Sequence, residues 1–460
     1  MIHIRAVLLL AVLGGCAVGP DYQRPEISTP DSWHEDLVRG LSPGGASLAN
    51  WWTVFDDAAL TALIDRAREG SHDLRVAVAR IAEAQARRGI ASGELFPAID
   101  ANALYEYTDP SDRVTGDMKS FDFYSAGLGA GWEVDLFGRV RRSVEATEAD
   151  FQASLELYRD VLVVLYASVA TNYVEVRSLQ KRIGYAEANI DAQAETLELV
   201  RARNRAGLVG DLDLREAELN LARTESVLPL LRQALTAAIN RLSVLIGEYP
   251  SHLHDELREP REIPLLPHQV LVGLPRDLLR QRPDLRQAER GLAAQTARIG
   301  VATADLYPRL TLLGTFSFDA SSSGNWFSAA AQSLSLGPQL RWNLFDGGSI
   351  RSNIRVQDAL AEQALVRYEQ AVLEAMEEVE NALASYVHES DRLDALGRSA
   401  TAAQQSVELV KTLYLTGLVD FQNVLDEERT LFEEQDKLAA SEGRVTQNLI
   451  QVYRTLGGGW

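Results

Sequence analysis

The sequence DLRVAVARIAEAQARRGIASGELFP, residues 73–97, recurs as DLRQAERGLAAQTARIGVATADLYP, residues 284–308. The two copies align without a gap at an offset of 211 residues. Solenoid repeats have periods of only about 20–50 residues, so a repeat at this distance indicates two large halves of similar construction. Whatever fold one half adopts is therefore expected twice.

In both halves, the helical spacing of apolar residues changes to alternation after the proline that ends the repeat. Ile99, Ala101 and Ala103 alternate with polar residues in the first half, and Leu310 and Leu312 share one face in the second. A period of two is typical of a strand with one apolar face. We expect two strands in each half, at about 98–108, 121–136, 309–319 and 333–345.

Strands of about ten residues suit a tilted transmembrane strand. A soluble sheet alternates in the same way and is the alternative. Four strands are too few for a barrel, because the smallest filled barrels have about eight. An open edge in lipid would also leave backbone groups unpaired. Membrane strands would therefore have to be pooled from several chains, and three chains would supply twelve.

Long helices follow each pair of strands. Residues 139–205 contain no proline and one glycine, and their apolar residues recur mostly at steps of three and four. This spacing is typical of a coiled-coil seam, and at 1.5 Å per residue such a helix extends about 100 Å. Each long helix reaches a glycine stop, Gly207 or Gly417, and we expect Asp211 or Asp420 to cap the return helix. The expected helices are 57–95, interrupted at Gly70-Ser71, 139–206, 211–246, 284–306, 348–415 and 420–456.

The N-terminus has the features of a secretory signal. A short basic start and an apolar run, Ala6–Leu13, lead through small residues to Cys16. Cys16 is the only cysteine of the chain, and a lone free thiol is uncommon in an exported protein. We expect residues 1–15 to be a signal peptide and Cys16 to carry diacylglycerol and an N-acyl chain. The alternative is an ordinary secreted protein with a stray cysteine.

Residues 16–56 are expected to form a lipidated N-terminal arm. The segment is rich in proline and glycine turns. Three tryptophans in it, Trp33, Trp51 and Trp52, would pack the arm onto the body of the protein.

The net charge and the motifs of the sequence exclude several classes of function. A net charge of −20 argues against nucleic acid as a partner. His252 and His254 form a His-x-His pair without a nearby cysteine, which favours a surface pair over a metal site. The sequence has no phosphate-loop motif and no triad pattern. We expect no enzyme activity, no metal and no cofactor apart from the covalent lipid on Cys16.

Five segments together carry a family resemblance. They are CAVGPDYQRP at 16–25, GLPRDLLRQRPDL at 273–285, LYP at 306–308, WNLFDGG at 342–348 and VLDEER at 424–429. Through them the chain resembles the TolC family of outer-membrane channels over nearly its whole length. It is most similar to the lipoprotein branch, the OprM/NodT type, which works with resistance–nodulation–division (RND) pumps. By this resemblance, Ala17 after the lipidated cysteine indicates the outer membrane.

The resemblance implies an α+β membrane fold with two internal repeats, 57–247 and 284–460, and an equatorial segment, 248–283. Three chains would pool four strands each into a transmembrane β-barrel, continuous with a long α-helical coiled-coil barrel. The implied function is a passive trimeric exit duct for small molecules in a tripartite efflux pump. The duct would lie in the cell outer membrane and extend into the periplasm.

The implied partners are two further copies of the chain, a periplasmic adaptor protein, an inner-membrane RND transporter and outer-membrane lipid. Two alternatives remain at this point. One is a type I protein-secretion duct of the same family, and the other is a non-channel coiled-coil lipoprotein of the envelope.

The resemblance also implies a periplasmic gate after the second reversal, at Asp426, Arg429 and Gln422. Three copies of Asp426 would form an acidic ring, and such rings select cations. Arg429 can pair with Asp426 three residues earlier on the same helix. A solvated helix face that includes Glu427 and Glu428 is the alternative. The reversals would dock the adaptor through Gly207, Leu208, Val209, Gly417, Leu418 and Val419.

Overall fold

The computed structural model describes residues 17–44, 48–111, 113, 119–264, 267 and 269–460. The chain divides into two compact units, each assembled from separate stretches of sequence. Unit 1 contains the described residues up to Ile27, together with Ala79–Leu155 and Gln287–Gln370. Unit 2 contains Ser28–Val78, Glu156–Arg286 and Ala371–Trp460. Both repeats contribute to both units because the long helices extend from one to the other, so repeat boundaries are not unit boundaries.

Helices make up most of the described chain, and their ends lie within about two residues of the expected ends. Ser71 has a non-helical ψ of 128° and produces the expected interruption. No helix among the described residues is both long and apolar enough to cross a membrane. The helices are α2 Ala58–Gly70, α3 His72–Gly93, α5 Arg139–Arg205, α6 Asp211–Leu245, α7 Leu278–Gln281, α8 Pro283–Ala304, α9 Ser349–Leu415 and α10 Phe421–Thr455, with short 3-10 helices η1 Trp51–Phe55, η2 Pro275–Asp277, η3 Ser323–Asn325 and η4 Ala329–Ala331.

The apolar seams of the two long helices are buried within unit 2. Val169, Tyr173 and Val176 of α5 are fully buried, at steps of four and three residues. Val379 and Leu383 of α9 are fully buried four residues apart. Because 3.6 residues make one turn, this spacing keeps each seam on one side of its helix.

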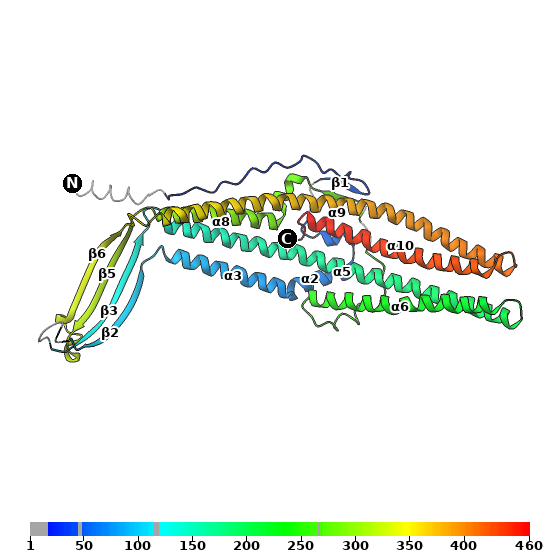
Figure 1. The fold of residues 1–460 in the computed structure, drawn as a ribbon, viewed down its shortest axis with the longest axis horizontal. Helices are drawn as coiled ribbons and strands as arrows, with labels where there is room; N and C mark the ends of the chain where they lie inside the picture. The colour runs from blue at the N-terminus through cyan, green and yellow to red at the C-terminus, as the bar shows by residue number, and fades with distance from the viewer. Residues whose placement is uncertain (1–16, 45–47, 112, 114–118, 265–266, 268) are drawn as a thin grey trace. The chain divides into compact units, whose positions relative to one another are not determined.

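Unit 1 contains a four-stranded antiparallel sheet, with its strands side by side in Figure 1. The sheet order is β2-β3-β5-β6, so the hairpin of each repeat pairs with the other through β3 and β5. Within the described part of the chain, the outer strands β2 and β6 pair on one side only. The strands are β2 Ala98–Thr108, β3 Phe121–Val134, β5 Arg309–Ala320 and β6 Gln332–Arg341.

Two strand ends were predicted wrongly. The strands expected to reach 136 and 345 end at Val134 and Arg341. The first residue of β5, Arg309, is the register partner of Arg341, so the chain beyond Arg341 has no strand to pair with. The neighbouring strand sets these ends, and the alternation of the sequence continues past them.

The N-terminal arm is held within unit 2 by a short parallel pair and by tryptophans. Strand β1 Leu41–Pro43 pairs with β4 Val270–Val272. Trp33 Nε1 donates a hydrogen bond to Gly273 O at 2.7 Å. Trp51 is buried and stacks on Tyr453, with ring centroids 5.4 Å apart. Trp52 is buried as well, so the expected packing role of the three tryptophans is confirmed.

The two helix reversals are built alike. Gly207 and Gly417 have positive φ angles of 72° and 76°, which residues with a Cβ rarely adopt. In each reversal the next amide donates to a carbonyl five residues back, which closes a Schellman motif and satisfies the helix end. These bonds are Leu208 N to Arg203 O and Leu418 N to Leu413 O, each 2.9 Å.

The expected aspartate caps are absent from the return helices. Asp420 occupies the N-cap of α10, but its side chain accepts no amide hydrogen bond there. In α6 the N-cap is Gly210. The carboxylate of Asp211 instead accepts from Asn204 Nδ2 at 3.1 Å and so ties the two ends of the turn together.

Alanine at either turn glycine is expected to lower the thermal unfolding midpoint. Gly207→Ala and Gly417→Ala should each cost about 1–2 kcal/mol, because a Cβ is strained in the left-handed region. Apart from the two adjoining residues, no described atom lies within 4 Å of the added Cβ at either position, so the cost comes from the backbone conformation.

Gly397→Ala is the matched control. Gly397 lies inside α9 and is equally open, but it has no positive φ. Alanine there should be neutral or stabilising by up to about 1 kcal/mol. Equal midpoints for all three variants in circular dichroism melts would contradict this account of the reversals.

Candidate functional site

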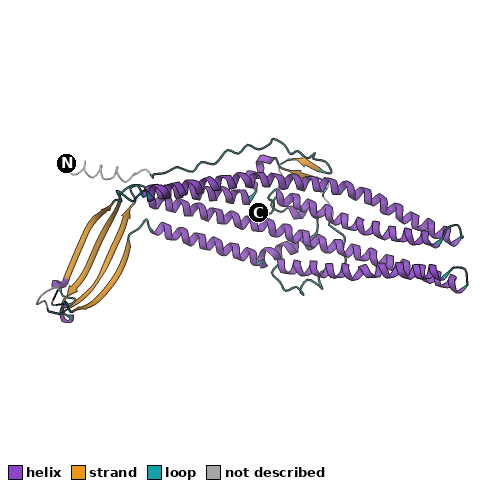
Figure 2. Cartoon of the chain, in the orientation of Figure 1, coloured by secondary structure: helices purple, strands orange, loops and turns teal. Residues whose placement is uncertain are grey.

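Two helix hairpins of unit 2 pack against each other near their reversals. The first is α5 with α6 and the second is α9 with α10, and Figure 2 shows both turns at the same end of these helices. One apolar cluster with members from all four helices joins them. Its buried members are Leu197, Val200, Ala217, Val410, Tyr414, Phe421, Val424 and Leu425.

The residue after each turn glycine is exposed, and the next one is packed. Leu208 and Leu418 are 68% and 72% exposed. Val209 and Val419 are partly buried against the apolar cluster. Each hairpin therefore anchors its own turn with a valine and leaves one leucine free for contact outside the chain.

The structure brings together the three residues predicted for the gate. Asp426 Oδ1 accepts from Gln422 Nε2 at 3.1 Å and from Arg429 Nη1 at 3.3 Å. All three lie on one face of α10, and the side chains of Asp426 and Arg429 are 53% and 42% exposed. An exposed ion pair contributes at most about 1 kcal/mol. Arg429 Nε is buried and has no hydrogen-bond partner within the described residues.

Sequence reasoning missed Glu428, which it assigned to a possible solvated face. The side chain of Glu428 is only 4% exposed. Its carboxylate accepts from Thr196 Oγ1 at 2.7 Å, from Lys411 Nζ at 2.9 Å and from Asn220 Nδ2 at 3.5 Å. These partners come from α5, α9 and α6, so this carboxylate of α10 links all four helices.

A signal for this burial was present in the sequence. Glu428 follows Val424 by four residues and Leu425 by three, which places it on the apolar stripe of α10. Its charge alone predicts that the Glu428 side chain faces solvent, whereas its position in the helical period predicts that the side chain faces the core. A buried carboxylate needs hydrogen-bond donors to offset its lost hydration, and here three helices supply them.

A second polar site in unit 2 surrounds Asp160 of α5. Arg282 bridges Asp284 and Glu378, at 2.6 Å and 2.8 Å. Burial, reinforced by the carboxylates of Asp284 and Glu378, raises the pKa of Asp160 to about 6, against the opposing effect of Arg282 and Arg454. The adjoining cavity of about 180 Å³ is lined by Asp160, Val163, Val164, Arg282, Pro283, Asp284, Glu378, Arg454 and Gly457.

The two histidines of the His-x-His pair face different partners. His252 Nδ1 lies 3.3 Å from Glu248 Oε2, and His254 Nε2 lies 2.9 Å from Asn240 Oδ1. Across the part of the chain that the structure describes, no group of three or more His, Cys, Asp or Glu residues could hold a metal ion.

The family model described as outer membrane efflux protein matches residues 63–248 and 274–458. The chain belongs to the outer membrane efflux protein family. Nodulation protein T of Rhizobium leguminosarum bv. trifolii is 29% identical over 97% of this chain and 94% of its own length. The toluene efflux pump outer membrane protein TtgI of Pseudomonas putida is 30% identical over 98% of this chain and 97% of its own length. The solved structure of the outer-membrane channel OprN matches with a TM-score of 0.91 and 36% identity, over 97% of this chain and 100% of that chain.

This outer membrane efflux protein is thus an outer-membrane channel component of an efflux pump, and the predicted resemblance to the TolC family is confirmed. Its fold is dominated by helices and matches that of the solved OprN channel. The predicted signal peptide and the lipidation of Cys16 lie outside the described residues and stay predictions.

Removing the carboxylate of Glu428 from this efflux protein should destabilise it. Glu428→Ala takes the acceptor away from the buried donors of Thr196 and Asn220 and is expected to cost about 1–3 kcal/mol. Glu427→Ala, one residue away and outside the buried network, is the control and should cost less than about 0.5 kcal/mol. Chemical denaturation followed by circular dichroism distinguishes the two. Similar losses for both variants would mean that Glu428 acts only through helix propensity.

Stability should also depend on pH through Asp160. Its folded pKa is raised above the ordinary aspartate value, so the folded chain holds this proton more tightly than the unfolded chain. The stability from that proton is lost as pH rises through about 6.

Asp160→Asn removes the cost of the charged form and should stabilise the chain by roughly 2 kcal/mol at pH 8, and by clearly less at pH 5. Exposed Asp191→Asn is the control. Thermal melts of both variants at the two pH values make the comparison. A stabilisation by Asp160→Asn that is equal at both pH values would refute the assignment.

Proposed function

We propose that this outer membrane efflux protein works as a passive, homotrimeric exit duct that carries small molecules through the periplasm and across the outer membrane. The observation that carries the proposal is the sheet of unit 1. Its outer strands, β2 and β6, are each paired on one side only, and both are exposed along their length.

Unpaired strand edges and exposed apolar side chains support pooling of the sheet. Ile99, Leu104, Leu336 and Leu340 are large hydrophobic residues of β2 and β6 that are exposed in the single chain. Apolar side chains in this number require lipid or another chain to cover them. If β6 of one copy pairs with β2 of the next, three copies close a ring of twelve strands with no free edge.

The long helices carry exposed apolar side chains as well. Val356, Val366 and Leu373 of α9 and Leu219 and Leu230 of α6 are exposed. In a trimer these residues would pack against helices of neighbouring copies, and the helices would enclose a tube. The energy for export would come from an inner-membrane RND transporter, to which a periplasmic adaptor protein would connect this chain.

The exposed leucines of the reversals support adaptor docking at the turns. Leu208 and Leu418 occupy equivalent positions after Gly207 and Gly417, so both hairpins offer the adaptor the same apolar contact. The valines packed beneath them fix the turns, so that the leucines are presented from a rigid base.

Contacts of the first described residues support a lipid anchor at Cys16. Val18 N donates to Phe137 O at 3.0 Å, directly where the sheet gives way to α5. Arg142 holds the same segment through the backbone carbonyl of Val18 at 3.2 Å and through the carboxylate of Asp21 at 2.7 Å. A lipid on Cys16 would thus lie close to the end of the proposed barrel at which the strands meet the long helices.

The group formed by Gln422, Asp426 and Arg429 is proposed as the gate. Three copies would place three carboxylates and three guanidiniums around one axis. Among the described residues, the hydrogen bond of the Arg429 guanidinium is the one from Nη1 to Asp426, so Nη2 of this half-exposed side chain can bind a neighbouring copy. Such contacts between chains would hold the periplasmic entrance closed.

Arg429→Ala is expected to increase the single-channel conductance of the purified protein in planar bilayers, because it removes the contacts that hold the entrance closed. Arg215→Ala is the matched control. Arg215 forms an exposed pair with Glu218 on α6 at the same three-residue spacing. A current that stays at the closed level in Arg429→Ala would rule out this gate.

A further inference from the structure

In each repeat, a tryptophan hydrogen bond ties the end of a strand to the segment between the preceding helix and the sheet; we call this region the junction. Trp132 Nε1 donates to Leu95 O at 3.0 Å, and Trp342 Nε1 donates to Leu306 O at 3.0 Å. The tryptophans are 210 residues apart and the carbonyls 211. Equivalent positions of the two junctions can therefore be compared residue by residue.

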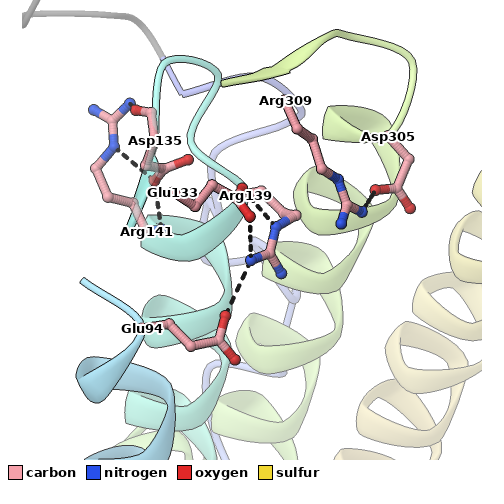
Figure 3. A network of polar contacts seen from close by, with 7 residues as sticks. All are labelled: Glu94, Glu133, Asp135, Arg139, Arg141, Asp305 and Arg309. Carbon is pink, nitrogen blue, oxygen red and sulfur yellow. Dashed lines mark hydrogen bonds and ion pairs between the residues drawn. The ribbon is translucent and has the colours of Figure 1, made fainter. Parts of the chain in front are cut away.

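In the first repeat an arginine fills the junction. Arg139 donates to both carboxylate oxygens of Glu133, at 2.9 Å and 3.0 Å, and to Glu94 Oε2 at 3.1 Å. Figure 3 shows this guanidinium between the two carboxylates. The three charges form a closed group with a net charge of −1.

In the second repeat the same offsets place Asp305 at the position of Glu94, Asn343 at that of Glu133 and Ser349 at that of Arg139. The arginine that fills the first junction is therefore missing from the second. A pocket of about 430 Å³ lies there. Its lining residues are Asp305, Tyr307, Arg309, Arg341, Trp342, Asn343 and Ile350.

Two arginines reach this pocket from opposite strands. Arg309 and Arg341 are register partners across β5 and β6. The corresponding register pair across β2 and β3 is Ala98 with Gly131. Like charges directly opposite each other in a sheet repel, so the second junction has gained a repulsive pair where the first has two small neutral residues.

Only one of the two arginines is neutralised. Arg309 forms an ion pair with Asp305, as Figure 3 shows. The side chain of Arg341 forms no hydrogen bond or ion pair with another described residue. The second junction thus carries a net charge of +1, from Asp305, Arg309 and Arg341. Two amides at the nearby start of α9 are already bonded, since Asp346 accepts from Gly348 N and Ile350 N at 2.8 Å and 2.6 Å.

We propose that this pocket binds the phosphate of a phospholipid headgroup, with Arg341 as its main ligand. A guanidinium fork matches the geometry of phosphate oxygens, and Asn343 adds a neutral polar group in place of the carboxylate of the first junction. Leu344 and Phe345, which follow directly, are 78% and 88% exposed and would contact the acyl chains. The proposal rests on the membrane placement of the sheet in the proposed function.

The test measures lipid retention by the full-length protein, purified in detergent and mixed with phosphatidylglycerol, by native mass spectrometry. Arg341→Gln should weaken retention roughly tenfold, because it removes a charge-assisted contact. Arg341→Lys should weaken it less, since the charge stays and the fork is lost. Exposed Arg355→Gln of α9, which does not line the pocket, should leave retention unchanged.

Three results would overturn the proposal. The first is retention by Arg341→Gln equal to that of the unaltered protein. The second is loss of the oligomer in Arg341→Gln, which would assign Arg341 to a contact between chains. The third is binding of inorganic phosphate alone without retained phosphatidylglycerol, which would leave a phosphate site but exclude the lipid as its source.

Failure of the proposed function has a different outcome. A protein that forms no pores in planar bilayers, yet retains phosphatidylglycerol through Arg341, would refute the duct and support the pocket. A conducting channel whose phosphatidylglycerol retention is unchanged by Arg341→Gln would refute only the proposed lipid site.

Discussion

The backbone along the outer edges of β2 and β6 is the constraint on which the rest of the structure depends. Each edge carries amide and carbonyl groups that no strand among the described residues satisfies. In water these groups bind solvent, but in lipid each unpaired group costs several kcal/mol. The exposed apolar side chains of the same strands are unfavourable in water. Both demands are met at once if the edges of separate copies pair, and the long helices that continue from the sheet are then brought together as well.

The helical part of the chain combines apolar packing with a few buried polar links. The apolar cluster near the reversals would tolerate small shifts of one hairpin against the other, because hydrophobic contact has no preferred direction. Glu428 does not tolerate such shifts, since its carboxylate must meet donors on three other helices. The cluster thus supplies adhesion, while Glu428 fixes the register of the two hairpins.

Most of the fold could be predicted from the sequence, because it follows from local rules. Periods of 3.6 and of two identified the helices and strands, and Gly207 and Gly417 marked the reversals. The errors arose where a distant segment decides the outcome. The end of β6 depends on where β5 begins, and Asp211 binds Asn204 in preference to capping its own helix. The candidate site was recovered in part: the contacts among Gln422, Asp426 and Arg429 follow from spacing on one helix. The burial of Glu428 and the opposition of Arg309 and Arg341 required knowing which elements lie together.

The near-identical construction of the two reversals has a consequence for symmetry. In a ring of three chains, the six turns would follow a backbone that is close to sixfold, with an exposed leucine at every position. The polar groups of Gln422, Asp426 and Arg429 occur after only one turn in each chain, so they would repeat threefold. A surface that recognises shape would meet six similar sites, whereas an ion approaching the axis would meet three. In such a ring, duplication followed by divergence would allow the same helices to carry two symmetries, one for assembly and one for permeation.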